Sequence, residues 1–385
     1  IMLSKNINFK SFKTKKINKA NKKNLLSLLK IKNELIKSLS LNYKNNFNLK
    51  KIKRLIGSSE IRLIGMGGSI LGTRAIYSFF GNKIKKKFHF VDNLNFKYKF
   101  RKKRYCNLII SKSGNTLETI SNFNVLRSKS DKNIFITQNQ RSYLFTLAQN
   151  LKSEVIHHNN FIGGRYSVLS EVGMLPAELM GLNPKKFRQL NNIIKNKTFL
   201  NLLLKNVEAI LSLNKQKKYN SILLNYNPNL INFLEWYKQL TAESLGKKSK
   251  GILPIISNMP KDNHSVMQLY IDGFKRNFYS FFFMVDKNSN VVNFKNLPKD
   301  YGYLNNKSLS NIIYNQKIAT ENVFMKKKIS FRSFNILKRD EKTLGELFIF
   351  FILETILLGK AMNVNPFDQP SVELIKIQTK KNLIT

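Results

Sequence analysis

The chain has 385 residues, of which 42% are hydrophobic and 23% are charged, a globular composition with enough length for two or three domains. Its longest apolar run, Leu347–Leu358, contains Glu354 and is shorter than the roughly 20 residues that span a bilayer, so we expect a buried helix and no membrane partner. Cys106 is the only cysteine, which excludes an intrachain disulfide; with no secretory signal pattern, this favours a cytoplasmic protein.

The formal net charge of +45 allows two interpretations. A basic protein can bind nucleic acid through the phosphate backbone. Alternatively, lysine has accumulated throughout the sequence by compositional drift and covers a solvated surface. Lysines occur in nearly every segment and no nucleic-acid-binding signature accompanies them, which favours drift and predicts no dedicated nucleic-acid partner. The charge can still attract an anionic substrate.

The first 55 residues are rich in lysine and asparagine. Within them, Leu25–Leu39 has the apolar spacing of an amphipathic helix. We therefore predict that residues 1–55 form a basic helical segment, packed on the first domain.

Strand and helix patterns alternate from Glu60 onwards, which is typical of a parallel α/β domain. Strands are predicted at 61–65, 106–110 and 133–137, and the first two are each followed by a polar, glycine-containing turn and a helix. This pattern predicts a first α/β domain over residues 56–200.

A second alternation begins near Ser221, where the strand 221–226 leads into a helix. We predict a second α/β domain over residues 201–360, followed by a C-terminal segment, 361–385.

The turn Gly65–Ser69 lies between a predicted strand and a predicted helix. Glycines in this position let a ligand approach the backbone and the helix N-terminus. However, the spacing is G-x-G-G-S, and no acidic residue ends a following strand where a dinucleotide site needs one, so we predict no nicotinamide cofactor. A tight turn without a ligand is the alternative.

Ser111–Thr116, sequence SKSGNT, is a better candidate for an anion site. Three hydroxyls and several backbone N–H groups gather at the start of a helix, an arrangement that suits the phosphate of a metabolite. The segment lacks the G-K-[ST] ending of a nucleotide-binding loop. A serine-rich helix cap is the alternative.

Two further segments carry groups for proton transfer. The sequence Asn229–Gly246 predicts one helix, with Asn229 as cap and Gly246 as stop, and it places Gln239 and Glu243 on one face. A carboxylate beside an amide suits abstraction of a proton next to a carbonyl. Arg165 follows two glycines and can stabilise a developing oxyanion. A solvated helix face and a solvated arginine are the alternatives.

His264, in the sequence DNHS, is a candidate acid or base near neutral pH. His157 and His158 are adjacent in sequence, with no Cys, His or carboxylate cluster at metal-ligand spacing, so we predict no metal site.

Taken together, these segments resemble the glucose-6-phosphate isomerase (phosphoglucose isomerase) family from about Glu60 to Lys380. Six ordered motifs carry the resemblance: GMGGSILG (65–72), SKSGNTLET (111–119), GGRYS (163–167), QLTAES (239–244), DNHS to QLYIDG (262–273) and NPFDQPSVELIK (365–376). Ser371 and Ile375 stand where the family usually has glycines, so we expect the backbone around Lys376 to differ locally.

The resemblance implies a fold of two sugar-isomerase-type, three-layer α/β/α domains with parallel sheets, plus helical terminal segments. It also implies interconversion of glucose 6-phosphate and fructose 6-phosphate, a reaction of glycolysis and gluconeogenesis, without a cofactor.

The resemblance further implies a role for each site residue. Substrate binding falls to Gly68, Ser69, Ser111, Lys112, Ser113, Thr116 and Gln239. His264 and Lys376 would assist opening of the sugar ring, Glu243 would move the proton between C2 and C1, and Arg165 would stabilise the cis-enediolate. A homodimer with a shared active site is implied, in which His264 comes from the partner copy. Another phosphosugar isomerase and a non-catalytic phosphosugar-binding regulator remain the alternatives.

Overall fold

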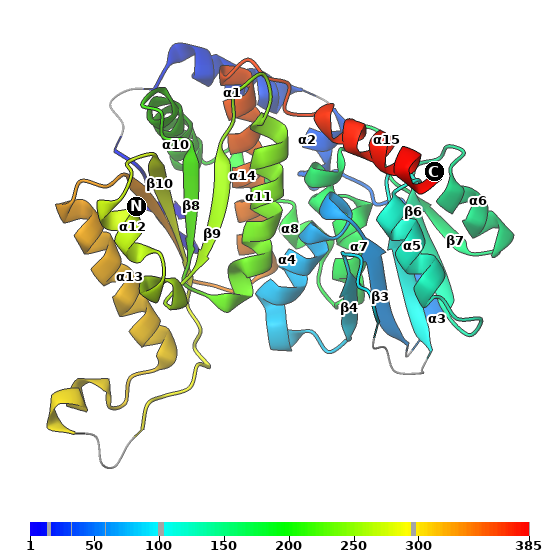
Figure 1. Cartoon of the computed structure of the whole chain (residues 1–385), viewed down its shortest axis with the longest axis horizontal. Coiled ribbons are helices and arrows are strands. Elements are labelled where there is room, and N and C mark those ends of the chain that lie inside the picture. Colours follow the sequence, from blue (N-terminus) through cyan, green and yellow to red (C-terminus); the bar gives the residue numbers. More distant parts are fainter. Residues whose placement is uncertain (14–16, 32, 58, 99–103, 294–297, 385) are drawn as a thin grey trace.

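The computed structural model describes residues 1–13, 17–31, 33–57, 59–98, 104–293 and 298–384. Two β-sheets lie side by side, each with helices on both faces (Figure 1). These two three-layer α/β/α units confirm the predicted fold class.

The first sheet has the strand order β4-β3-β5-β6-β7, and all of its pairings are parallel. Its strands are β3 (Glu60–Gly65), β4 (Phe88–Val91), β5 (Tyr105–Ile110), β6 (Lys132–Thr137) and β7 (Glu154–His157). The chain starts inside the sheet, moves to one edge at β4, and then returns past β3 to build the other side. The order therefore reverses between β3 and β5.

The second sheet has the order β1-β2-β11-β10-β8-β9. Its strands are β1 (Met2–Ser4), β2 (Ile7–Lys10), β8 (Asn220–Asn225), β9 (Leu253–Asn258), β10 (Asn277–Met284) and β11 (Phe331–Ile336). β8 to β11 pair in parallel, whereas β2 runs antiparallel to β11.

Most of the helices belong to one of the two units. The helices of the first unit are α3 (Leu49–Ile56), α4 (Leu71–Phe80), α5 (Leu117–Leu126), α6 (Tyr143–Asn150) and α7 (Glu171–Leu179). Those of the second are α10 (Lys197–Lys215), α11 (Ile231–Leu245), α12 (Met267–Asp272), α13 (Leu309–Lys326) and α14 (Glu341–Ala361). The remaining helices are α1 (Lys19–Lys30), α2 (Glu34–Ser38), α8 (Pro184–Phe187), α9 (Leu190–Ile193) and α15 (Ser371–Ile384).

One hydrophobic core joins the two units. It takes in the inner helices α4 and α7 of the first unit and α10, α11 and α14 of the second. α5 and α6 cover the outer face of the first sheet, and α12 and α13 cover that of the second, each over a separate apolar cluster. α4 and α11 pack against each other between the sheets (Figure 1), so the predicted catalytic helix lies at the junction of the units.

The N-terminal segment differs from the prediction of a helical segment packed on the first domain. β1 and β2 belong to the second sheet, because Ile7 and Phe9 alternate with exposed neighbours and so fit a strand with one buried side. The predicted helix 25–39 is instead two helices, α1 and α2, and α1 packs on α14.

One helix start also differs. Asn227, rather than Asn229, caps the turn before α11, and a short 3-10 turn, Pro228–Leu230, precedes the helix; Gly246 ends α11 as predicted. α10 spans the predicted domain boundary between residues 200 and 201 and packs on α14.

α14 is the buried helix that the long apolar run predicted. It carries Glu354, whose charge is paired with Arg332 at 2.5 Å, and both side chains are fully buried. Arg332 also donates to Asn206 Oδ1, Tyr237 OH and Ser280 Oγ at 2.8–3.0 Å. Among the described residues, no helix combines the length and apolar character needed to cross a bilayer.

Removing one partner of this buried pair should be costly, because the other charge stays buried without compensation. We expect Glu354→Ala to lower the free energy of unfolding by about 3–5 kcal/mol in urea denaturation. The control is Glu235→Ala, which removes the half-exposed pair with Lys238 on α11 and should cost less than about 1 kcal/mol. Equal losses in the two variants would contradict the assignment.

Candidate active site

The two predicted ligand-binding turns lie next to each other at one edge of the first sheet. The Gly65–Ser69 turn follows β3 and the Ser111–Thr116 loop follows β5, and these strands are direct parallel neighbours with Gly65 opposite Ile110. Strand order reverses between them, and in open α/β sheets ligands bind outside the carboxyl ends of the strands at such a switch point. Neither turn could be placed beside the other from the sequence alone.

The Ser111–Thr116 loop is held in shape from within. Ser111 Oγ lies 2.8 Å from Thr116 Oγ1 and accepts from the N–H of Gly114 at 3.1 Å. Gly114 has φ +66°, and a Cβ there would lie 2.0 Å from Ser142 Oγ, so only glycine fits.

The loop opens onto the N-terminus of α5. Thr116 precedes the helix, but its side chain makes no capping hydrogen bond, so the first-turn N–H groups remain available to an anion. Lys112 is half-buried, and burial lowers the pKa of its ammonium. His158 is buried, and burial is the main reason why its pKa is lowered to about 4. The positive charge of Lys112 lowers this pKa further, so the imidazole is neutral at pH 7.

The glycine turn after β3 contacts the second unit directly. Gly67 has φ +51°, and a Cβ on it would lie 2.7 Å from Gln239 Nε2. A Cβ on Gly68 would lie 2.2 Å from the carbonyl carbon of Gly164. Because Gly67 and Gly68 have no side chains, the backbone of the Gly65–Ser69 turn can lie directly against α11 and against the Gly164–Leu169 segment.

Gln239 and Glu243 share a face of α11, as predicted. Gln239 Nε2 donates to Glu243 Oε2 at 3.0 Å, and Arg165 Nη1 lies 3.6 Å from Glu243 Oε1. The Glu243 side chain is 24% exposed, whereas that of Arg165 is 3% exposed. The carboxylate is thus accessible to a ligand while the guanidinium behind it is fixed.

Arg165 is anchored by four hydrogen bonds. Its acceptors are Ser244 Oγ (2.8 Å), Gln369 Oε1 (2.7 Å) and the backbone oxygens of Pro366 (2.8 Å) and Asp368 (3.0 Å). A guanidinium has five N–H donors. One donor therefore remains, and it is on Nη1, the nitrogen nearest to Glu243.

Sequence reasoning missed the residues that hold Arg165. Tyr166 adds to the anchor, because its hydroxyl contacts Ser244 Oγ and the oxygen of Pro366 at 2.9 Å, and burial raises the pKa of that phenol. Ser244 and the N-P-F-D-Q run were present in the motifs, but nothing in their spacing indicated that they bind an arginine in a distant part of the chain.

His264 does not lie near Glu243 in the same chain. α11 starts beyond the carboxyl end of β8 and runs back along the sheet, so Glu243 lies about 18 Å of helix away from that end. His264 lies in the Lys261–His264 turn, beyond the carboxyl end of the parallel neighbour β9, and it is exposed. The two residues are therefore at opposite ends of the second sheet.

Lys376 lies on α15, a helix with no buried residue, and its ammonium pairs with Glu373 on the same helix at 2.6 Å. Ser371 and Ile375, which replace the usual glycines, are both part of this helix. Their higher helix propensity relative to glycine explains the continuous helix around Lys376.

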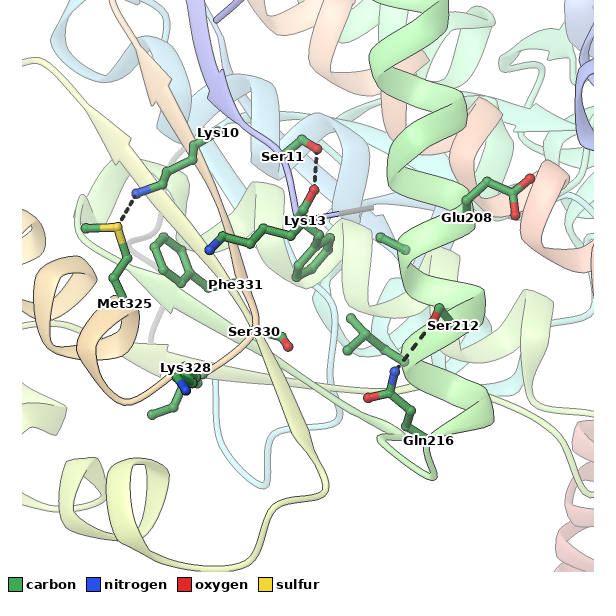
Figure 2. Close-up of a pocket in the computed structure, with 14 residues that line it drawn as sticks. Lys10, Ser11, Lys13, Glu208, Ser212, Gln216, Met325, Lys328, Ser330 and Phe331 are labelled. Carbon is green, nitrogen blue, oxygen red and sulfur yellow. Dashed lines mark hydrogen bonds between the residues drawn. The ribbon is translucent and has the colours of Figure 1, made fainter. Parts of the chain in front are cut away.

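A cavity of about 760 Å³ lies away from this site, between the C-terminal ends of α10 and α13 (Figure 2). Lys10, Ser212 and Phe331 are among its lining residues, and it contains none of the predicted site residues. In the part of the chain that the structure describes, no group of three or more His, Cys, Asp or Glu side chains is arranged to hold a metal ion.

An accessible carboxylate beside an anchored guanidinium, at the point where the glycine turn of the first unit meets α11, suits an enzyme that moves a proton next to a carbonyl. Comparison with known proteins agrees. The phosphoglucose isomerase family model matches residues 49–252. The glucose-6-phosphate isomerase of Methanocaldococcus jannaschii is 32% identical, over 85% of this chain and 84% of the relative. The chain belongs to the phosphoglucose isomerase family.

A second relative supports this assignment, and a solved structure supports the fold. The glucose-6-phosphate isomerase of Mycoplasmopsis synoviae is 34% identical, over 82% of this chain and 80% of the relative. A solved hypothetical protein from Thermus thermophilus has the same fold, with a TM-score of 0.82 at 23% identity, over 95% of this chain and 94% of that one. The predicted family is confirmed, and the chain is an aldose–ketose isomerase.

The contact between Gly68 and Gly164 predicts a sharp steric effect. Gly68→Ala should abolish most isomerase activity and lower the thermal unfolding midpoint, because its Cβ would collide with backbone that cannot move aside. Gly302→Ala is the control, since a Cβ there meets nothing within 4 Å. A fully active and stable Gly68→Ala variant would show that the two turns do not meet as described.

Proposed function

We propose that this chain interconverts glucose 6-phosphate and fructose 6-phosphate, with Glu243 as the base that moves a proton between C2 and C1. One observation carries the assignment: an accessible carboxylate lies between an amide donor at 3.0 Å and an immobilised guanidinium at 3.6 Å. Isomerisation next to a carbonyl needs a positioned base and a stabiliser of the enediolate, and these groups supply both.

We assign the phosphate to the loop after β5. Ser111, Ser113 and Thr116 would donate to its oxygens, together with the backbone around Lys112 and the N-terminus of α5. Gly68 and Ser69, on the neighbouring turn after β3, would place the sugar. The adjacency of the two turns supports one ligand that spans both.

In the proton transfer, Glu243 takes the proton from C2 of the open-chain aldose and returns it to C1. The hydroxyl proton on O2 passes to O1, so C1 becomes an alcohol, C2 becomes a ketone and the enzyme ends unchanged. The intermediate cis-enediolate carries negative charge on oxygen. The single uncommitted N–H of Arg165 is available to that oxygen, and Gln239 would orient the sugar hydroxyls.

We further propose a homodimer in which a second copy supplies His264. Within one chain, His264 and Glu243 lie at opposite ends of a sheet, so His264 reaches this site only from another copy. α15 supports the same proposal, because Leu374, Ile375 and Ile377 are more than half exposed on a helix that buries nothing. His264 and Lys376 would then assist ring opening.

A non-catalytic phosphosugar-binding protein, one of the alternatives from the sequence, would use the same loop after β5. A binding module needs no base, and the partly exposed Glu243 beside anchored Arg165 favours catalysis.

We also propose a cytoplasmic location. Cys106 is a free, buried cysteine, and burial raises the pKa of its thiol to about 12, so nothing about this residue calls for an oxidising compartment.

The test of the base is Glu243→Gln, which keeps the size and hydrogen-bonding capacity of the side chain but removes its basicity. We expect kcat to fall by about three orders of magnitude or more with little change in KM, because only the transition state loses an interaction. Fructose 6-phosphate is supplied, and glucose 6-phosphate is detected through a coupled NADP-dependent dehydrogenase. Glu235→Gln, on the same helix, is the control; normal turnover by Glu243→Gln would refute the proposal.

The shared site is tested by complementation. His264→Ala and Glu243→Gln chains should each be inactive alone. When mixed, unfolded and refolded together, the heterodimer restores one intact site, and about a quarter of wild-type activity is expected if half of the dimers are mixed and each has one working site. Mass spectrometry of differently tagged chains measures the exchange. Exchanged dimers without activity would rule out a shared site.

A further inference from the structure

The turn Asn365–Gln369 is held from two sides by two cations. Arg165 binds the backbone oxygens of Pro366 and Asp368 and the side chain of Gln369. Lys247, one residue beyond Gly246 at the end of α11, also binds this turn, through Asn365 and Asp368. The turn therefore lies between the guanidinium of the site and a lysine that none of the proposed steps uses.

Lys247 makes three contacts with its ammonium. Nζ donates to the backbone oxygen of Ser244 at 3.0 Å and to that of Asn365, and it pairs with Asp368 Oδ1 at 2.9 Å. Its side chain is only 12% exposed. Asp368 is further fixed by Asn365 Nδ2, which donates to Oδ2 at 2.9 Å, and the hydrogen bond from Lys247 is the main cause of the lowered pKa of this carboxyl group.

We propose that Lys247 is a positioning residue for the isomerisation: it fixes the Asn365–Gln369 turn, and that turn holds the Arg165 guanidinium at its working distance from Glu243. The inference rests on the proposed roles of Arg165 and Glu243. Lys247 acts on them through Asp368 and the backbone oxygens of the turn.

The Asn365–Gln369 turn and Glu243 compete for the guanidinium of Arg165. Four acceptors hold Arg165, and three of them belong to the turn that Lys247 fixes. If the turn loosens, the guanidinium can close the 3.6 Å gap to Glu243 and form a tight ion pair. That pair would consume the donor needed by the enediolate and neutralise the base. Substrate binding at the loop after β5 would be unaffected, because Lys247 is not part of it.

The test compares Lys247→Met with Lys248→Met. Each variant loses one positive charge from the segment that follows α11. Lys248 is exposed, however, and its ammonium lies 3.5 Å from the backbone oxygen of Asn363, which is outside the Asn365–Gln369 turn. We expect kcat of Lys247→Met to fall by about 10- to 100-fold with KM within about twofold of wild type. Lys248→Met should stay within about twofold in both constants, and Lys247→Arg should recover most of the lost kcat.

A double-mutant cycle adds a readout that general destabilisation would not give. Asp368→Asn keeps the backbone oxygen that Arg165 uses but removes the charge that Lys247 pairs with. If the two residues act through one contact, Lys247→Met combined with Asp368→Asn should lose no more activity than the worse single variant. Circular dichroism and the urea midpoint check that each variant is folded.

Several outcomes would overturn the inference: unchanged kcat in Lys247→Met, an equal loss in Lys248→Met, no recovery in Lys247→Arg, or additive losses in the cycle. Arg165→Lys and Glu243→Gln are measured alongside. If these two lose activity while Lys247→Met does not, only the positioning role fails. If they keep activity, the proposed function itself fails.

Discussion

The candidate site depends on the immobilisation of one guanidinium. Arg165 is almost fully buried, and a buried charge is tolerated only when its donors are satisfied. Ser244 from α11, Gln369 and two backbone oxygens near the end of the chain provide four acceptors. These acceptors bring three distant parts of the chain to one point. The same bonds leave a single N–H toward Glu243. Arg165 therefore both holds these segments together and takes part in the proposed reaction.

The direction of α11 explains how the two units build one site. Its start lies beyond the carboxyl end of β8, and it crosses the sheet, so its last turns meet the glycine turn at the switch point of the first sheet. The site thus combines the carboxyl ends of the strands of the first sheet with the amino ends of the strands of the second sheet. Packing of α4 on α11 in a common core fixes this relation. His264 lies at the carboxyl ends of the strands of the second sheet, so the same geometry keeps it away from Glu243 of its own chain.

Much of the fold was predictable from local patterns. Periodicity and stop signals predicted strands β3, β5, β6 and β8, the buried helix α14 and the end of α11 at Gly246, whereas β4, β7, β9, β10 and β11 were not predicted. β1 and β2 were missed, because a short strand among lysines and asparagines gains its stability from pairing with β11, a strand near the other end of the chain. The break between α1 and α2 was missed because the apolar spacing continues through it.

The sequence by itself determined the residue types and their local placement: hydroxyls at the start of α5, Gln239 and Glu243 on one helix face, and glycines where turns must be tight. Such features depend on neighbours in sequence, since they follow from backbone geometry and helical periodicity. Only the tertiary structure decided which turns become neighbours, that Arg165 is anchored by the Asn365–Gln369 turn, and that His264 lies away from Glu243. These relations arise from strand order and long-range packing, which no local pattern encodes.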